Sequence, residues 1–136
     1  MSPPNSSRQA LLIVDHGSRS AAANAPLAEL ARTLSEARPD WLVEHAHMEL
    51  AEPDFKSAID RLVSRGAKKI LIHLHFLGEG FHVRETLPDL ITTARERHPD
   101  VPIRTTLPLG RDPRIVEIVL DRMDAQSAPD RQSSKA

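Results

Sequence analysis

Three side chains in the sequence could hold a divalent metal ion or accept a proton: His16, Glu49 and His82. Neutral imidazole and carboxylate suit borderline divalent ions such as iron, cobalt, nickel or zinc. Imidazole also gains or loses a proton near neutral pH. A site with so few protein ligands leaves coordination positions open for a substrate. The three residues therefore predict metal chemistry if the fold brings them together.

The composition excludes several other kinds of site. The 136 residues include no cysteine, which excludes disulfides, thiolate nucleophiles, Cys-ligated zinc and iron–sulfur clusters. A formal net charge of -1 and an aromatic content of 3% disfavour a nucleic-acid partner, which needs a basic surface or a stacking platform. No apolar run approaches the ~20 residues of a membrane span. Residues 1–8 lack the apolar core of a secretory signal, so we expect a cytoplasmic protein.

Strand and helix patterns alternate along most of the chain. Short runs rich in branched residues predict buried strands, and apolar residues at helical spacing predict the helices between them. The expected strands are residues 10–15, 42–49, 69–77 and 102–107, and the expected helices are residues 21–37, 53–65, 81–98 and 112–124. This order predicts an α/β fold of three layers, a flavodoxin-like domain whose four-stranded parallel sheet is flanked by helices. We expect one domain at residues 10–125, between a disordered leader at 1–9 and a disordered tail at 126–136.

The expected sheet explains how the three candidate residues would meet. His16 follows the first expected strand, Glu49 ends the second, and His82 follows the third. Ligands of such sheets bind outside the C-terminal ends of the strands. Gly17 permits a tight turn after His16, and Ser18 is the expected N-cap of the following helix. A lone loop histidine is more often bonded to backbone, but two histidines and an acid at one edge favour a site.

Six short stretches resemble, in order, the short form of the sirohydrochlorin chelatase family. They are residues 11–19 (LLIVDHGSR), 48–53 (MELAEP), 66–70 (GAKKI), 76–83 (FLGEGFHV), 87–88 (LP) and 107–114 (LPLGRDPR). The His-Gly-Ser-Arg and Phe-Leu-x-x-Gly-x-His pieces are specific in combination, although neither is specific alone. The resemblance covers about residues 10 to 123.

The resemblance implies a lyase that inserts cobalt, iron or nickel into the tetrapyrrole sirohydrochlorin, with release of two protons. In the family, the histidines of the two specific pieces and an acid after the second strand serve metal insertion. These roles fall on His16, His82 and Glu49, both as metal ligands and as catalytic residues. The divalent metal is then a substrate, and no organic cofactor is expected.

Sirohydrochlorin carries several carboxylates, so its cleft needs cationic groups and N–H donors. The residues expected to bind them are Ser18, Arg19, Arg84 and Arg111. For the arginines, a solvated surface charge is an equally good interpretation. The family resemblance also implies a homodimer that acts on sirohydrochlorin in cobalamin or siroheme biosynthesis, without a nucleic-acid or membrane partner.

Asp15 departs from the family, which commonly has a small residue before His-Gly-Ser-Arg. The carboxylate could orient His16, or it could mark a divergent or inactive member. It also disfavours a histidine phosphatase, which needs an arginine at this position to hold phosphate. A second alternative is a non-catalytic protein that binds or delivers metal on the chelatase fold.

Four further histidines motivate that second alternative. Alternation along a strand places His45 and His47 on one face, and His73 and His75 on one face. We favour polar packing over a second metal site, because the expected order separates the two pairs by the first strand. The sequence identifies neither the metal nor the tetrapyrrole pathway.

Overall fold

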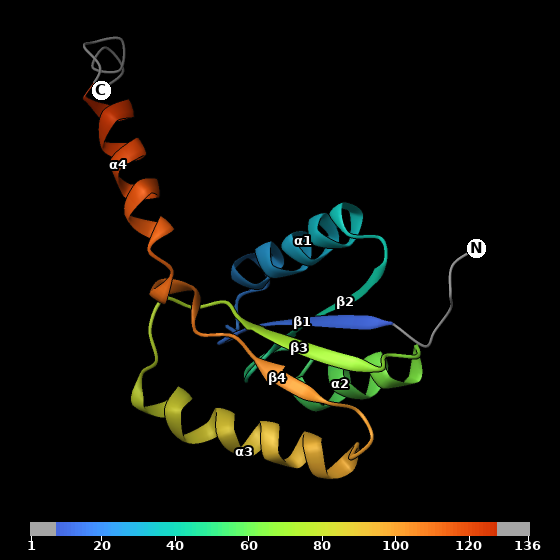
Figure 1. The fold of residues 1–136 in the computed structure, drawn as a ribbon. Helices are drawn as coiled ribbons and strands as arrows, with labels where there is room; N and C mark the ends of the chain where they lie inside the picture. The colour runs from blue at the N-terminus through green and yellow to red at the C-terminus, as the bar shows by residue number, and fades with distance from the viewer. Residues whose placement is uncertain (1–7, 128–136) are drawn as a thin grey trace.

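The computed structural model describes residues 8–127, with the backbone alone for Phe81 and His82. The eight expected strands and helices are all present (Figure 1). They are β1 (Gln9–Asp15), α1 (Ala21–Ala37), β2 (Trp41–His47), α2 (Phe55–Ser64), β3 (Lys69–Leu74), α3 (Phe81–Arg97), β4 (Ile103–Thr105) and α4 (Arg114–Gln126), with a short 3-10 helix, η2 (Leu109–Arg111), before α4. The expected leader and tail fall mostly outside the described residues and stay predictions.

The four strands form one parallel sheet in the order β2-β1-β3-β4. The prediction of an α/β fold with a four-stranded parallel sheet is therefore confirmed, and the first and third strands are neighbours as expected. Three strands end earlier than predicted, β2 at His47, β3 at Leu74 and β4 at Thr105. After β2 the chain turns at Leu50, whose φ of 74° is incompatible with a continuing strand.

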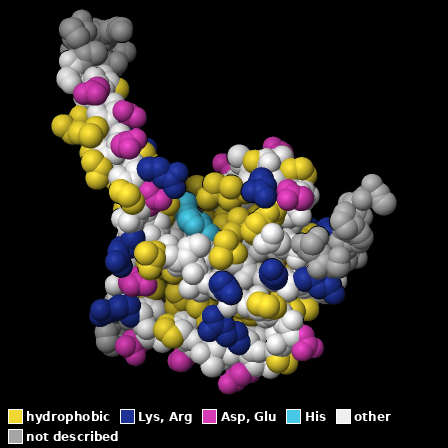
Figure 2. Space-filling view, viewed as in Figure 1, with side chains coloured by type: hydrophobic (Ala, Val, Ile, Leu, Met, Phe, Trp, Pro, Cys, Tyr) yellow, Lys and Arg dark blue, Asp and Glu magenta, His cyan; other side chains and the backbone are white. Residues whose placement is uncertain are grey.

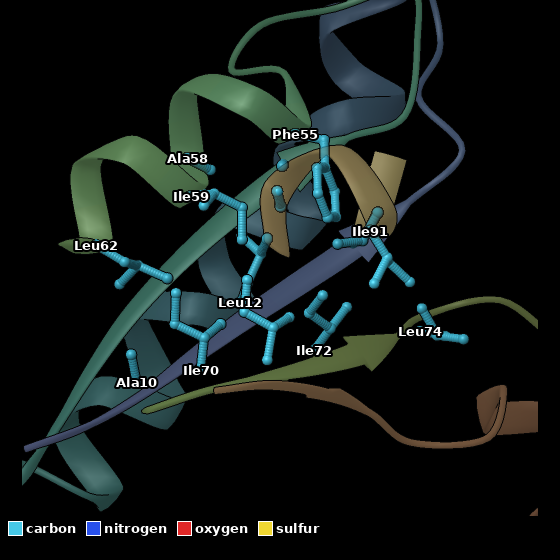
Figure 3. Close-up of a cluster of buried hydrophobic side chains, with 14 of the residues drawn as sticks. Ala10, Leu12, Phe55, Ala58, Ile59, Leu62, Ile70, Ile72, Leu74 and Ile91 are labelled. Atoms are coloured by element: carbon cyan, nitrogen blue, oxygen red, sulfur yellow. The ribbon is translucent and has the colours of Figure 1, made fainter. Parts of the chain in front are cut away.

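The main hydrophobic core lies between the sheet and the helices α2 and α3 (Figure 3). Leu12 and Ile72 of the sheet pack there with Ile59 and Leu62 of α2, and all four are fully buried. Strand alternation sends Ile13 to the opposite face, where it packs against Leu27 and Ala31 of α1 in a smaller cluster. Helices therefore cover both faces, although α1 alone covers the second face.

Hydrogen bonds fix the ends of the helices that flank the core. Asp54 caps α2 by accepting from the backbone N–H of Ser57 at 2.8 Å, which lowers the pKa of Asp54. Asp60 of α2 accepts from Arg97 at 2.7 Å and pairs with His98 at 2.8 Å, so it ties α2 to the end of α3. These bonds, Arg97 first, lower the pKa of Asp60 to about 2.

Helix α4 differs from the other three helices because it extends away from the sheet (Figure 1). None of its residues is buried, whereas α1, α2 and α3 all contribute to a core. Within residues 8–127, no helix is long and apolar enough to cross a membrane.

Candidate functional site

The loops after β1 and β2 are locked together at the edge where the strands end. The backbone N–H of Glu49 donates to the carbonyl of His16 at 3.1 Å. Gly17 has a φ of 93°, and a Cβ at this position would lie 2.0 Å from the carbonyl oxygen of Glu49. Only glycine permits both the turn and this close approach. The local backbone therefore holds His16 next to Glu49, and both side chains are exposed.

The loops after β3 and β4 are joined to each other in a similar way. The N–H of Gly110 donates to the carbonyl of Phe76 at 3.3 Å, and a Cβ at Gly110 would lie 1.8 Å from the carbonyl oxygen of Leu77. The ring of Phe76 also contacts the ring of His16, with 5.6 Å between centroids. All four strand-end loops thus belong to one connected surface.

His82 lies in the first turn of α3, at the same edge of the sheet. Its side chain is outside the described part of the structure, so its metal-binding role stays a prediction. Among the side chains that the structure describes, no three His, Cys, Asp or Glu residues are placed to hold one metal ion.

Ser18 has a different local role from the one predicted. The N-cap of α1 is Ser20, whose hydroxyl accepts from the N–H of Ala23 at 3.2 Å. The hydroxyl of Ser18 accepts from the N–H of Ser20 at 3.0 Å, and its own N–H donates to the side chain of Asn24. The predicted cap was wrong by two residues: both serines suit a cap, but Ser20 is the residue directly before Ala21, where α1 begins as expected.

The three predicted arginines lie on different strand-end segments, and all are exposed. Arg19 precedes α1, and Arg111 ends η2. Arg84, in the first turns of α3, lines a cavity of about 560 Å³ between α3 and the segments that follow β3 and β4. Glu79 and Leu107 line the same cavity, so it opens toward the strand-end edge.

Three exposed leucines also surround this edge, and the sequence analysis missed them. Leu50, Leu77 and Leu107 are 52%, 68% and 66% exposed, and each follows a different strand. Leu50 keeps a left-handed φ of 74°, which a non-glycine residue adopts only at a cost. The sequence could have indicated them by their position, because each is an apolar residue in a strand-end segment that otherwise carries polar side chains. We call these three leucines, one after each of β2, β3 and β4, the apolar rim.

Asp15 does not pair with His16. Its carboxylate is 2.6 Å from Nδ1 of His47, which is 1% exposed. The suggestion that Asp15 orients His16 was therefore wrong: in the parallel register Asp15 lies beside His47 of β2, so its carboxylate partners that buried imidazole.

The other histidines form neighbouring pairs on the α1 side of the sheet. His45 contacts His47 with 5.7 Å between ring centroids, and Nε2 of His73 lies 3.1 Å from Nδ1 of His75. Ile13 of β1 stands between His45 and His73 in the strand register, which confirms that the two pairs are separated. Burial, followed by the neighbouring imidazole, lowers the pKa of both His45 and His73. These two side chains are therefore neutral at neutral pH.

Comparison with known proteins gives a consistent result for sequence and structure. The sequence model of the CbiX family matches residues 10–126. The chain is 30% identical over 138 residues to the sirohydrochlorin cobaltochelatase of Methanocaldococcus jannaschii, covering 84% of this chain and 96% of the relative. It is 36% identical over 113 residues to the chloroplastic sirohydrochlorin ferrochelatase of Arabidopsis thaliana, covering 83% of this chain.

The chain spans about half the length of the Arabidopsis enzyme, 50% of which is covered. The structure of SirB from Bacillus subtilis with Fe3+ superposes with a TM-score of 0.80 at 29% identity, covering 90% of this chain and 48% of SirB. SirB from Bacillus subtilis subspecies spizizenii in complex with cobalt gives a TM-score of 0.73 at 30% identity, covering 87% and 50%. The chain belongs to the CbiX family, the sirohydrochlorin chelatases.

Proposed function

We propose that this chain inserts a divalent metal ion into sirohydrochlorin, as the names of its relatives describe for those proteins. Cobalt and iron are the first candidates, and nickel is the third. The observation that carries the proposal is the contact of Gly17 with Glu49, which holds His16 and Glu49 side by side at the strand-end edge. The metal and the tetrapyrrole are both substrates, and the proposal needs no organic cofactor.

The chemistry is an exchange of two pyrrole N–H protons for one divalent ion. Exposed His16, in its neutral form, can hold the incoming cation or accept a proton. Glu49, held beside it, can take a proton or orient the ion. His82 completes the group if its side chain turns toward this edge. The three residues thus divide metal delivery and proton removal among them.

The surroundings of His16 and Glu49 suit a flat, anionic macrocycle. Arg84 lines the cavity between α3 and the segments after β3 and β4, and Arg19 and Arg111 are exposed on other strand-end segments, where they can bind carboxylates together with the N–H groups near Ser18. The rim of Leu50, Leu77 and Leu107 offers apolar contact to the ring face. The edge therefore combines the two kinds of contact that a carboxylated tetrapyrrole requires.

The proposal includes three properties of the whole protein. It acts in the cytoplasm, in cobalamin or siroheme biosynthesis, without a nucleic-acid or membrane partner. It works as a symmetric dimer, because a single sheet edge covers a flat macrocycle on too few sides. The strand-end edges of the two copies then face a shared cavity.

An insertion assay with cobalt, iron and nickel tests the proposal through the change in visible absorption of sirohydrochlorin. We expect His16→Ala and His82→Ala each to lower turnover by about 100-fold or more, and the double variant to lose little beyond that. His98→Gln is the matched histidine control, because His98 lies at the opposite end of α3 and should keep turnover.

Wild-type turnover in either alanine variant would contradict the site. A wild-type rate no higher than spontaneous insertion would refute the enzyme and favour the alternative, a protein that binds or delivers metal on this fold. The closely spaced imidazoles of His73 and His75 are the observation behind that alternative.

A further inference from the structure

His47 is buried at the end of β2, although its side chain is polar. It is 1% exposed, and among the residues that the structure describes it is the one buried polar or charged residue. Figure 2 shows a histidine side chain exposed in the hollow between α1 and the start of α4, so burial is not common to all histidines of the chain. A polar group is costly to bury unless it has a hydrogen-bond partner. The burial of His47 therefore depends on its partner, which is Asp15.

The bond between these two side chains crosses the last pair of residues in the β1–β2 ladder. Oδ1 of Asp15 lies 2.6 Å from Nδ1 of His47, and the two residues are partners in the parallel register. A carboxylate can only accept, so the imidazole carries its proton on Nδ1 and donates it. A hydrogen bond to a carboxylate is stronger than one between neutral groups, and the side chains here are only 23% and 2% exposed. The pair therefore joins the ends of β1 and β2 through side chains as well as through the backbone.

The same two residues lead directly into the candidate site. Asp15 is the residue before His16, and His47 is two residues before Glu49. A Cβ placed on Gly17 would lie only 2.9 Å from the Cβ of His47. The side chain of His47 thus begins directly beside the turn that holds His16 against Glu49. A movement of His47 relative to Asp15 would therefore displace the segments that carry both candidate ligands.

Backbone bonds connect His47 to the start of α2 on its other side. The N–H of His47 donates to the carbonyl of Pro53 at 2.9 Å, and His47 forms a parallel bridge with Asp54, the N-cap of α2. The N–H of Met48 donates to the carbonyl of Asp15 at 2.9 Å. His47 therefore lies between the segment that begins α2 and the end of β1, and it can hold the two in a fixed relation.

We infer that Asp15 and His47 are positioning residues for metal insertion, because their bond fixes the ends of β1 and β2 and so keeps His16 beside Glu49. The inference rests on the proposed function. It gives a role to Asp15, which stands where the family commonly has a small residue, since a small apolar side chain there could not accept from His47. Asp15 then supports the site and does not mark an inactive member.

A second aspartate–histidine pair offers a matched control away from the site. Oδ1 of Asp60 in α2 lies 2.8 Å from Nε2 of His98, the C-cap of α3. Helix α3 begins at the strand-end edge and ends at the opposite edge, so this pair joins two helices far from the turn after β1. Breaking either pair should lower stability, but only the pair of Asp15 and His47 should affect turnover.

Two substitutions of His47 separate the loss of the bond from the loss of packing. The amide nitrogen of asparagine can take the place of Nδ1, whereas glutamine carries its amide near the position of Nε2. His47→Asn therefore keeps a donor for Asp15 but leaves the larger void, and His47→Gln fills more of the volume but loses the donor. A merely structural role would make turnover follow stability, whereas a positioning role makes turnover follow the bond.

Insertion kinetics and denaturant unfolding, measured on the same variants, are the first test. We expect kcat of His47→Gln to fall about 10-fold with little change in KM, a moderate loss because the backbone bonds remain, and kcat of His47→Asn to stay within about 3-fold of wild type despite its lower stability. His98→Gln should lose stability and keep kcat. Wild-type kcat in folded His47→Gln, or equal losses in His47→Asn and His47→Gln, would overturn the inference.

Substitutions of Asp15 give the same comparison from the partly exposed side of the bond, where a variant of the buried histidine fails to fold. Asp15→Asn keeps an oxygen acceptor and should retain most of kcat, whereas Asp15→Leu removes the acceptor and should lose about 10-fold. The double variant of Asp15→Leu and His47→Gln should lose little more than the larger single loss, because both changes break one bond. Losses that multiply in the double variant would contradict a shared role.

Calorimetric binding of Co2+ alone gives a measurement that does not need insertion. The relevant quantity is the part of the binding that His16→Ala removes. We expect His47→Gln to weaken this part about 10-fold, and His47→Asn and His98→Gln to keep it. If the wild type binds Co2+ but does not insert it, the proposed function fails, and an unchanged Co2+ affinity in His47→Gln would then overturn the inference as well. A wild type that neither binds nor inserts Co2+ would overturn both.

Discussion

Alanine substitutions at four glycines separate a requirement for backbone conformation from a requirement for close approach. Gly66 has a positive φ of 100° and open space where a Cβ would lie. Gly110 has no positive φ, but a Cβ there would lie 1.8 Å from the backbone of Leu77. Gly17 combines both constraints, and Gly78, in the loop before α3, has neither. The four positions thus form a complete set of controls.

A substitution that violates only the constraint on φ should have the smaller effect, a loss of stability without a loss of turnover. Gly66→Ala forces alanine into the left-handed region, which costs about 1–2 kcal/mol and lowers the melting temperature by roughly 3–8 °C. Gly66 lies between α2 and β3, at the edge opposite the site, so metal insertion should be unchanged. Gly78→Ala should change neither the melting temperature nor the rate of metal insertion by much, because its Cβ would meet nothing within 4 Å.

Close approach adds a displacement of the site itself. In Gly17→Ala the carbonyl oxygen of Glu49 lies 2.0 Å from the new Cβ and must retreat by roughly 1.4 Å to reach ordinary contact. A shift of about 1 Å in a catalytic group costs on the order of 100-fold in rate. We expect Gly17→Ala to lose that much turnover in addition to the stability lost in Gly66→Ala. Gly110→Ala should lose turnover through movement of Leu77.

Thermal unfolding and initial rates of cobalt insertion, measured on all four variants, separate the effect of backbone conformation from the effect of close approach. The reasoning requires that Gly17→Ala and Gly66→Ala both lose stability but differ in turnover by about 100-fold. If Gly17→Ala inserts metal at the wild-type rate while folded, the contact between Gly17 and Glu49 does not organise the site. Equal loss of turnover in Gly78→Ala would show that any change in these loops is harmful.

Three further substitutions test the site and the framework. Glu49→Gln should lower kcat by about 100-fold while KM changes little, because it removes a proton acceptor and keeps its shape; a change confined to KM would assign Glu49 to binding alone. Burial lowers the pKa of His73 below 6.5 in the folded chain, so on acidification the unfolded chain binds a proton at this histidine before the folded chain does. The contribution of His73 to the free energy of unfolding is therefore complete above pH 6.5 and is lost as the pH falls toward the lowered pKa of the folded state. His73→Gln should flatten the fall in the free energy of unfolding below pH 6.5, as denaturant titrations at several pH values would reveal. Asp60→Asn should destabilise the fold by roughly 0.5–1 kcal/mol at pH 7, a modest value because the side chain is 35% exposed, and should leave turnover intact; unchanged stability would show that the bonds to Arg97 and His98 contribute nothing.

Much of the fold could be predicted from the pattern of apolar residues within short segments of the sequence. Runs such as residues 10–15 are too short for helices and too apolar for surface loops, and alternation with amphipathic segments leaves little choice but a parallel sheet. The strand ends were placed less well, because the apolar pattern continues past His47 and Leu74 while the backbone has already turned. The exposed placement of α4 was not predictable, since its apolar spacing indicates a helix and does not indicate what the helix packs against.

The site was predictable to the extent that it depends on strand order. His16 and Glu49 meet because neighbouring parallel strands end at one edge, and the family motifs indicated the same residues. The apolar rim was missed because nothing in the local sequence distinguishes Leu77, which is exposed, from Leu74, which is buried three residues earlier. That difference arises only where β3 ends and the chain leaves the sheet.

The histidines of β2 and β3 show how one sequence pattern acquires two physical roles. Both pairs alternate along a strand on the same face of the sheet, so the sequence treats them alike. In the structure, His47 is buried and has the carboxylate of Asp15 as its partner, whereas His73 and His75 are half-buried and lie next to each other. Burial, followed by the neighbouring imidazole, lowers the pKa of His73, because a charge on this half-buried side chain would carry a cost of desolvation. The two pairs therefore differ in their partners, and that difference follows from which strand and which side chains lie beside each pair, which alternation along one strand does not show.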